Sequence, residues 1–153
     1  MANIAASGSD GPRLAICGRA KVRGSVDGAW WPSSSELRIE LPDLVAVVGN
    51  WIGPIRRVVY DPGIWRPGPS RIIRGNEVTR VDPYRLVAPD TIYLTGRQRD
   101  AVLFVVPPST SRAIVRRVLH TVSESARPIS AALLRELLHR HASLGVELAD
   151  SLL

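Results

Sequence analysis

Hydrophobic positions along this chain change their spacing twice, and each spacing predicts a different kind of element. Residues 13–17 alternate, with Leu14 and Ile16 on one side, and predict a short strand. Apolar residues between positions 55 and 106 come in short β-branched runs separated by turn residues, which is typical of an antiparallel sheet. After Pro108 they recur every three or four positions, which indicates helices.

One helix is expected in the N-terminal half. Ser33 and Glu36 fit a capping box, in which each side chain bonds the other residue's amide at the start of a helix. Pro42 removes an amide and disfavours helical geometry at Leu41, so a strand over residues 37–41 followed by a helix is the alternative. We favour a helix that is kinked or broken at Pro42. Its apolar stripe consists of Leu37, Leu41, Leu44, Val45, Val48, Trp51 and Ile52.

Six runs in the middle of the chain predict strands. Gly75-Asn76 is a tight-turn signal between the second and third of them. The last run is apolar throughout and is expected to be a central strand covered on both faces, ended by Pro107-Pro108. The runs are Ile55 to Tyr60, Arg71 to Arg74, Glu77 to Asp82, Tyr84 to Val87, Thr91 to Thr95 and Ala101 to Val106.

Two helices are expected to close the chain. Ser109 or Thr110 can cap the first and Ser130 the second, and Arg127-Pro128 separates them. The buried side of the second helix is expected to hold Leu133, Leu134, Leu137, Leu138 and His141. The same spacing continues through Leu144, Leu148 and Leu152, so this end packs either on its own core or on a partner.

These elements predict an α+β fold: a five- or six-stranded, mainly antiparallel sheet, one helix in the N-terminal half and two C-terminal helices. A length of 153 residues fits one domain. We expect residues 13–142 to form it, after a disordered or extended segment over residues 1–12. Residues 143–153 form a leucine-rich tail with helical spacing.

Charge is distributed unevenly along the chain. The net charge is +6, and twelve arginines stand against five acidic residues between positions 54 and 117. The chain has neither the start of a signal peptide nor the roughly 20 uninterrupted apolar residues that cross a bilayer. We therefore expect a basic, cytoplasmic protein without a membrane partner. A lone cysteine, Cys17, excludes an internal disulfide.

Catalytic motifs are missing from the sequence. It contains no phosphate-binding glycine loop, no nucleophile elbow and no zinc-binding histidine helix. His139 and His141 lie about 200° apart around a helix and cannot chelate one metal ion from one face. We expect no catalytic residue, no metal and no cofactor, and we regard a non-enzymatic role as the better interpretation.

Asp27, Trp30 and Trp31 stand together between a glycine-rich stretch and Pro32. In one interpretation Asp27-Gly28 makes a turn and the indoles anchor the first helix to the sheet. In the other, Asp27, Trp30, Trp31 and Trp65 line a ligand site to which Asp27 offers a carboxylate. The sequence does not decide between them.

Arginines that alternate with apolar residues also admit two interpretations. They form the solvated face of a half-exposed sheet, or they form an anion-binding surface on which Trp65, Tyr84 or Tyr93 stacks against bases of RNA or DNA. No recognised nucleic-acid-binding motif accompanies them. The arginines concerned are Arg56, Arg57, Arg71, Arg74, Arg80 and Arg85.

Several short segments, each present once, serve as landmarks along the chain. They are Asp27-Gly28-Ala29-Trp30-Trp31-Pro32, Glu40-Leu41-Pro42, Gly53-x-Ile55-x-Arg57-Val58, Asp61 through Trp65, Asp82-Pro83-Tyr84 and Asp100 through Pro107-Pro108-Ser109-Thr110. In order and spacing the chain resembles a small actinobacterial family classed as a domain of unknown function, over about residues 13–122. The resemblance favours helix over residues 37–51 and brings no catalytic residues with it. Asp61 stands where the family pattern has asparagine, and Tyr84 where histidine is common.

Three functions are compatible with these observations. The first is a non-enzymatic interaction module, which binds a protein partner or associates with itself through the C-terminal leucines. The second is binding of RNA, DNA or a ribonucleoprotein through an arginine-rich sheet face. The third is a small-molecule binder or enzyme centred on Asp27 and the tryptophan pair. We favour the first.

Overall fold

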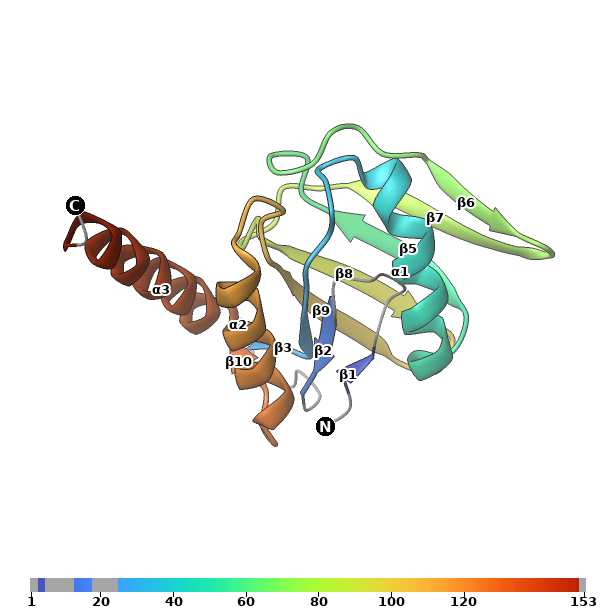
Figure 1. Ribbon diagram of the computed structural model, residues 1–153. Helices are drawn as coiled ribbons and strands as arrows, with labels where there is room; N and C mark the ends of the chain where they lie inside the picture. The colour runs from blue at the N-terminus through green and yellow to red at the C-terminus, as the bar shows by residue number, and fades with distance from the viewer. Residues whose placement is uncertain (1–2, 5–12, 18–24, 152–153) are drawn as a thin grey trace.

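The computed structural model describes residues 3–4, 13–17 and 25–151, with side chains for 13–17 and 25–142. Figure 1 shows a twisted sheet with one helix over one face, a second helix over the other, and a third helix that projects away from the sheet. The helices are α1 (Leu37–Ile52), α2 (Arg112–Glu124) and α3 (Ala131–Ser151).

Ten strands build two sheets in the described part of the chain. They are β1 (Asn3–Ile4), β2 (Leu14–Ile16), β3 (Ser25–Val26), β4 (Gly28–Trp30), β5 (Ile55–Tyr60), β6 (Arg71–Arg74), β7 (Glu77–Pro83), β8 (Thr91–Gly96), β9 (Asp100–Val105) and β10 (Ile129–Ser130). The main sheet has eight strands in the order β1-β2-β4-β9-β8-β5-β7-β6, and β10 pairs with β3 beside it. Within the main sheet β4–β9 and β5–β7 are parallel pairs, and the other neighbours are antiparallel.

The α+β class, the three helices and the mainly antiparallel sheet are confirmed, but the predicted number of strands is too low. The sheet gains short strands at its N-terminal end, where β4 carries a glycine and a tryptophan in three residues and shows no alternation. The predicted strand over residues 84–87 does not form. Two of its amides bind the end of β5 and the residue after it: Tyr84 N donates to Tyr60 O over 2.9 Å, and Leu86 N donates to a carboxylate oxygen of Asp61.

The hydrophobic interior consists of two clusters, one on each face of the main sheet. Strand β9 contributes to both, since Leu103 and Val105 point toward α1 while Phe104 points toward α2. The central strand covered on both faces is therefore confirmed. Each cluster is built from side chains that are spaced by two along the strands and by three or four along the helices.

Helix α1 runs without interruption from Leu37 through Pro42 to Ile52, so the helical interpretation is confirmed and the strand alternative is wrong. The break that we expected at Pro42 does not occur. Pro42 has no amide hydrogen to donate to the carbonyl of Arg38, an exposed residue in the first turn. The capping box is also wrong. Helix α1 begins one turn later than it requires, and Glu40 in its first turn accepts from Ser33 N (2.7 Å) and Ser34 Oγ (3.0 Å).

The two C-terminal helices occur as expected, with one change of cap. Ser111, and neither Ser109 nor Thr110, caps α2 by accepting from Ile114 N. Ser130 Oγ accepts from Leu133 N over 3.0 Å, which confirms the second cap. Leu134 is buried, whereas Leu133 is exposed, contrary to its predicted burial.

The structure describes the two ends of the chain only in part. The backbone of α3 continues to Ser151, so the tail is helical there, while the side chains of its leucines lie outside the described residues. Apart from β1, the N-terminal residues 1–12 also lie outside them. None of the helices in the described residues is long and apolar enough to span a bilayer.

Two glycines provide a test of the packing at β4. A Cβ on Gly28 would lie 2.2 Å from the Ala15 carbonyl oxygen of β2, whereas a Cβ on Gly49 of α1 would meet no atom closer than 4.0 Å. We expect Gly28→Ala to lower the free energy of unfolding by about 3 kcal/mol, because β2 has to move. Gly49→Ala is the matched control and should raise it by about 0.5 to 1 kcal/mol. Urea unfolding of both variants measures the difference, and equal effects would contradict this account of β4.

Candidate functional site

Trp30 and Trp31 are buried on opposite faces of the sheet. Strand β4 lies between β2 and β9, and consecutive residues of a strand point to opposite sides. Trp30 therefore enters the cluster beneath α1, and Trp31 enters the cluster beneath α2. Neither indole presents a face to solvent.

Each tryptophan has a specific neighbour. Trp30 stacks on Trp65, with 5.4 Å between ring centroids and 23° between the ring planes. Trp65 follows a loop that is held by Asp61, whose carboxylate accepts from Gly63 N and Leu86 N. Trp31 lies 4.3 Å from the guanidinium carbon of Arg13, an arrangement that favours a cation–π interaction.

Asp27 is part of the strand pairing. Only 3% of the residue is exposed, and its Oδ2 accepts from Val102 N over 2.8 Å. Its backbone amide donates to Val102 O, and its carbonyl accepts from Cys17 N. Asp27 thereby ties the start of β4 to β9. Its carboxylate binds a backbone amide of the neighbouring strand, whereas the ligand hypothesis requires that it face a cavity.

The four residues of the tryptophan hypothesis thus serve packing first. Asp27, Trp30 and Trp31 are enclosed by the two clusters and the strand pairing. Trp65 is buried too, but it lines a cavity of about 280 Å³ together with Pro32. These placements support the interpretation of the pair as the anchor between α1 and the sheet.

Three of the six arginines form one row across neighbouring strands. Arg57 of β5 lies beside Arg80 of β7, and Arg80 lies beside Arg71 of β6. Their neighbours along the strands, such as Val58, Val81 and Ile72, belong to the cluster beneath α1. The three guanidinium groups therefore project from the opposite face, on strands spaced by about 4.8 Å.

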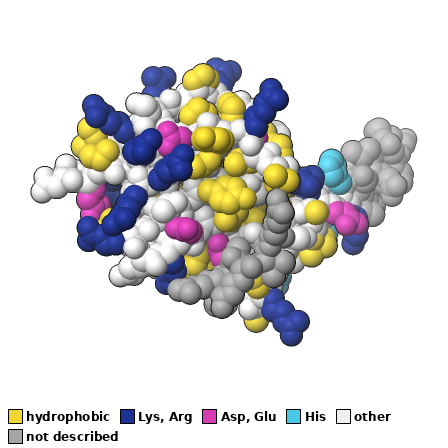
Figure 2. Space-filling view, turned by 180° about the vertical axis from the view of Figure 1, so that it is seen from behind, with side chains coloured by type: hydrophobic (Ala, Val, Ile, Leu, Met, Phe, Trp, Pro, Cys, Tyr) yellow, Lys and Arg dark blue, Asp and Glu magenta, His cyan; other side chains and the backbone are white. Residues whose placement is uncertain are grey.

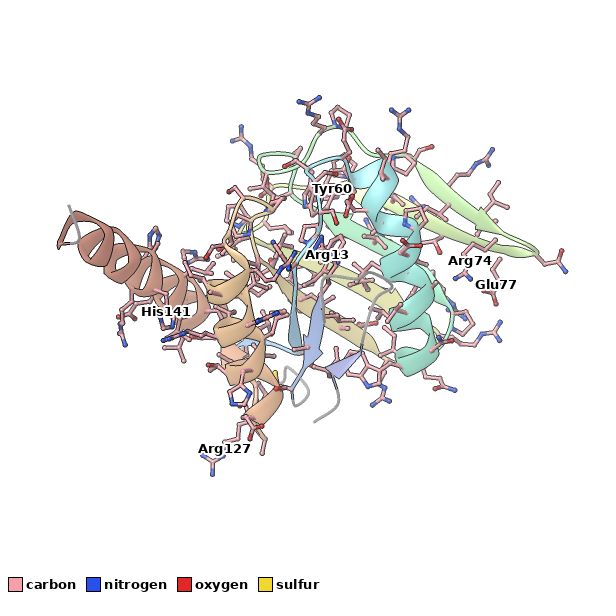
Figure 3. All side chains as sticks on the ribbon, viewed as in Figure 1. Arg13, Tyr60, Arg74, Glu77, Arg127 and His141 are labelled. Carbon is pink, nitrogen blue, oxygen red and sulfur yellow. The ribbon has the colours of Figure 1, made fainter. Side chains whose placement is uncertain are left out.

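The other three arginines are placed elsewhere. Arg56 is exposed at an irregularity in the β5–β8 pairing, and Arg85 is exposed in the loop after β7. Arg74 lies opposite Glu77 in the β6–β7 register, beside the hairpin turn. Both residues line a groove between this hairpin and α1 (Figure 3). The structure therefore does not assemble all six on one surface.

Apolar side chains flank the arginine row on the same face. Tyr93 of β8 is 43% exposed, and Ile73 and Val78 of the β6–β7 hairpin are 60% and 52% exposed. Val59 and Val102 lie beside Tyr93 in neighbouring strands and are half-buried. We call this surface the open face. It comprises Arg57, Val59, Arg71, Ile73, Val78, Arg80, Asp82, Tyr93, Thr95 and Val102.

The open face is the half of the sheet that α2 does not cover. Helix α2 packs on β2 and β4, at the other end of the strand order. Helix α1, which packs on β5, lies on the other face of the sheet. Figure 2, which views the molecule from behind relative to Figure 1, shows hydrophobic side chains gathered in the middle with arginines around them.

Positive charge on the open face is only partly compensated. Arg57 Nε lies 2.8 Å from Asp82 Oδ2, and Arg80 lies 3.9 Å from the same oxygen. Arg71 has no carboxylate within ion-pair distance among the described residues. One carboxylate therefore faces three guanidinium groups at the β7–β6 end.

A second feature lies where α3 meets the end of β9. Arg135 of α3 binds Asp90 with two parallel hydrogen bonds, Nε to Oδ2 and Nη2 to Oδ1, both 2.7 Å. The hydrogen bond to Asp90 raises the pKa of Arg135, so the guanidinium stays charged. The pair lines a cavity of about 580 Å³, which we call the Asp90 cleft. The sequence carried no signal for this pair, because 45 residues separate its members.

A metal site finds no support in the part of the chain that the structure describes. No three His, Cys, Asp or Glu side chains come together there in a way that could hold an ion. His139 lines the Asp90 cleft without a second histidine.

Residues 13–122 match the model of a family described as "Family of unknown function (DUF5994)". The chain belongs to this family. The resemblance expected from the landmark segments is thereby confirmed at the level of a family of unknown function. Neither a curated protein nor a solved structure matches the chain.

The open face and the Asp90 cleft differ in how far they lie within the DUF5994 match. Every residue of the open face lies within residues 13–122. The Asp90 cleft combines residues of the matched region with Arg135, Leu138 and His139 of α3, which lie beyond it. The open face is thus part of the family domain, and one wall of the cleft is added by α3.

The role of Asp27 can be tested by stability. We expect Asp27→Ala to lower the free energy of unfolding by about 1–3 kcal/mol, because the amide of the half-buried Val102 loses its side-chain acceptor. Asp27→Asn keeps an oxygen acceptor and should retain a larger part of the stability. Urea unfolding compares the two, and an Asp27→Ala protein as stable as the parent would refute the structural role.

Proposed function

We propose that the chain is a non-enzymatic, cytoplasmic interaction module that binds a protein partner through the open face. The observation that supports this most directly is the uncovered half of the sheet, where exposed apolar side chains adjoin a row of three arginines. The partner we expect offers an apolar surface flanked by acidic side chains.

Exposed apolar side chains are the first argument. A sheet face that only meets water carries polar residues at its outward positions. Here Ile73 and Val78 lie opposite each other on the adjacent strands β6 and β7, and Tyr93 occupies an outward position on β8. All three leave a large part of their surface in water. Neighbouring exposed apolar residues of this kind mark interaction sites more often than isolated ones do.

Composition is the second argument. Tyrosine and arginine are enriched in protein interfaces, where apolar side chains form the centre and polar ones the rim. Tyr93 and Val59 occupy the middle strands of the open face, while Arg71 and Arg80 lie toward the β6 edge. This distribution supports an interface with a basic side.

Charge supports a partner with acidic residues, and the aliphatic residues favour a protein over a nucleic acid. Arg71 has no carboxylate within ion-pair distance among the described residues, and Arg80 shares the Asp82 carboxylate with Arg57, so both can bind a carboxylate of a partner. A nucleic-acid surface uses several aromatic side chains for stacking, whereas the open face has one aromatic residue, Tyr93, and four aliphatic ones.

Photo-crosslinking in the native host tests the surface, with a photoreactive amino acid at position 73. Position 39 is the matched control, because Ile39 lies on α1, away from the open face, and is 65% exposed, close to the 60% of Ile73. We expect one defined protein adduct at position 73 and none at position 39. The same adducts at both positions, or none at either, would overturn the proposal. An adduct with RNA or DNA at position 73 would decide for the nucleic-acid alternative.

Charge reversal tests the basic side of the same surface. Arg71→Glu with Arg80→Glu should reduce the yield of the position-73 adduct about tenfold, because like charges then face the acidic partner. Arg116→Glu with Arg117→Glu on the exposed side of α2 makes the same change of charge and should leave the yield unchanged. Equal losses with both pairs would show that net charge, and not the open face, governs the interaction.

A further inference from the structure

The Asp90 cleft lies between the end of β9, the segment before α2, and α3. Its volume of about 580 Å³ is in the range of small-molecule sites. Six of the twelve lining residues are apolar. Ile114 of α2 and Leu138 and Ala142 of α3 have accessible surface, whereas Phe104 and Val105 are buried behind them. The cleft can therefore enclose an apolar body about the size of a substituted aromatic ring.

Hydrogen-bond donors outnumber acceptors on the polar side of the cleft. Arg135 uses two of its five N–H groups on Asp90, and the remaining ones have no partner among the described residues. Ser109 and Thr110 add hydroxyl groups that donate no hydrogen bond to the described residues. His139 adds a ring nitrogen.

The Asp90 pairing fixes the position of these donors. Two parallel hydrogen bonds of 2.7 Å hold the plane of the Arg135 guanidinium against the carboxylate. A guanidinium that is already oriented loses less side-chain entropy when it binds a further oxygen. Both Asp90 oxygens are occupied, so an oxygen of a ligand meets the spare N–H groups without displacing the pair.

We propose that the Asp90 cleft binds a small monocarboxylate with an apolar body. The body packs on Ile114 and Leu138, and the carboxylate accepts from the spare N–H groups of Arg135 and from the hydroxyls of Ser109 and Thr110. This site is independent of the open face, since the two share no residue.

A second, smaller cavity adjoins the cleft. It shares Asp90, Val105, Pro107 and Ser109 with the cleft and ends at Trp65. A ligand longer than one ring extends from Arg135 toward Ile64 and Trp65. The stacked tryptophans thus have an indirect part in the site, through the wall that Trp65 provides.

A titration with 4-phenylbutyrate, followed by amide and arginine-side-chain NMR signals of the full chain, tests the proposal. 4-Phenylbutyramide is the matched neutral probe. We expect the carboxylate to shift the signals of Val105, Ser109, Thr110 and Arg135 Nε, and to bind about tenfold more tightly than the amide. Equal affinity for both probes would overturn the carboxylate class. The absence of any shift at these signals up to about 10 mM of probe would overturn the site, because a ligand of this size binds a formed site with a lower dissociation constant than that.

Two alanines of α3 provide variants that leave the Asp90–Arg135 pair intact. Ala142 lines the cleft and is exposed, so Ala142→Phe adds a phenyl ring at the α3 side of the cleft without disturbing the core. Ala132 is exposed on the same helix outside the cleft, and Ala132→Phe is the matched control. Binding of 4-phenylbutyrate should disappear in the first variant and persist in the second. Binding that survives Ala142→Phe would overturn the assigned position.

Discussion

Trp30 and Trp31 are adjacent in the chain and point to opposite faces of the sheet, so one three-residue strand and the residue after it supply a large side chain to each hydrophobic cluster. The arrangement requires β4 to keep its place between β2 and β9. Gly28 permits the close approach of β2, and the Asp27 carboxylate binds β9 where no regular pair forms. The helices α1 and α2 thus pack on surfaces whose positions β4 determines, and a shift of β4 by one residue would exchange the two indoles.

Periodicity predicted the elements that are long or strongly patterned. The apolar stripe of α1 was strong enough to outweigh Pro42, and the apolar run of β9 correctly indicated burial on both faces. Local signals failed where tertiary contacts decide. Ser33 and Glu36 fit a capping box, but the segment before α1 is held by Glu40. Residues 84–87 have the composition of a strand, but Asp61 and the end of β5 bind their amides in a loop.

The candidate sites were less predictable, because each depends on which strands become neighbours. Arg57, Arg80 and Arg71 stand on one row only because β5 and β7 pair in parallel, a register that single-strand patterns do not encode. The sequence did hold one usable signal in Arg71-Ile72-Ile73-Arg74. Consecutive strand residues point to opposite faces, so two adjacent isoleucines imply that one of them is directed outward. Asp27 was singled out for its carboxylate, whose partner, the Val102 amide, lies 75 residues away.

The boundary between the covered and the open half of the sheet connects the two proposed sites. Asp90 begins the turn into β8, whose residue Tyr93 lies on the open face, and it also receives Arg135 from α3. Helix α3 is therefore tied to the sheet at the place where the cover of α2 ends. Since α3 lies beyond the residues that match DUF5994, the open face is complete without it, whereas the cleft loses its charged wall. The two sites are separable in structure, and α3 modifies only one of them.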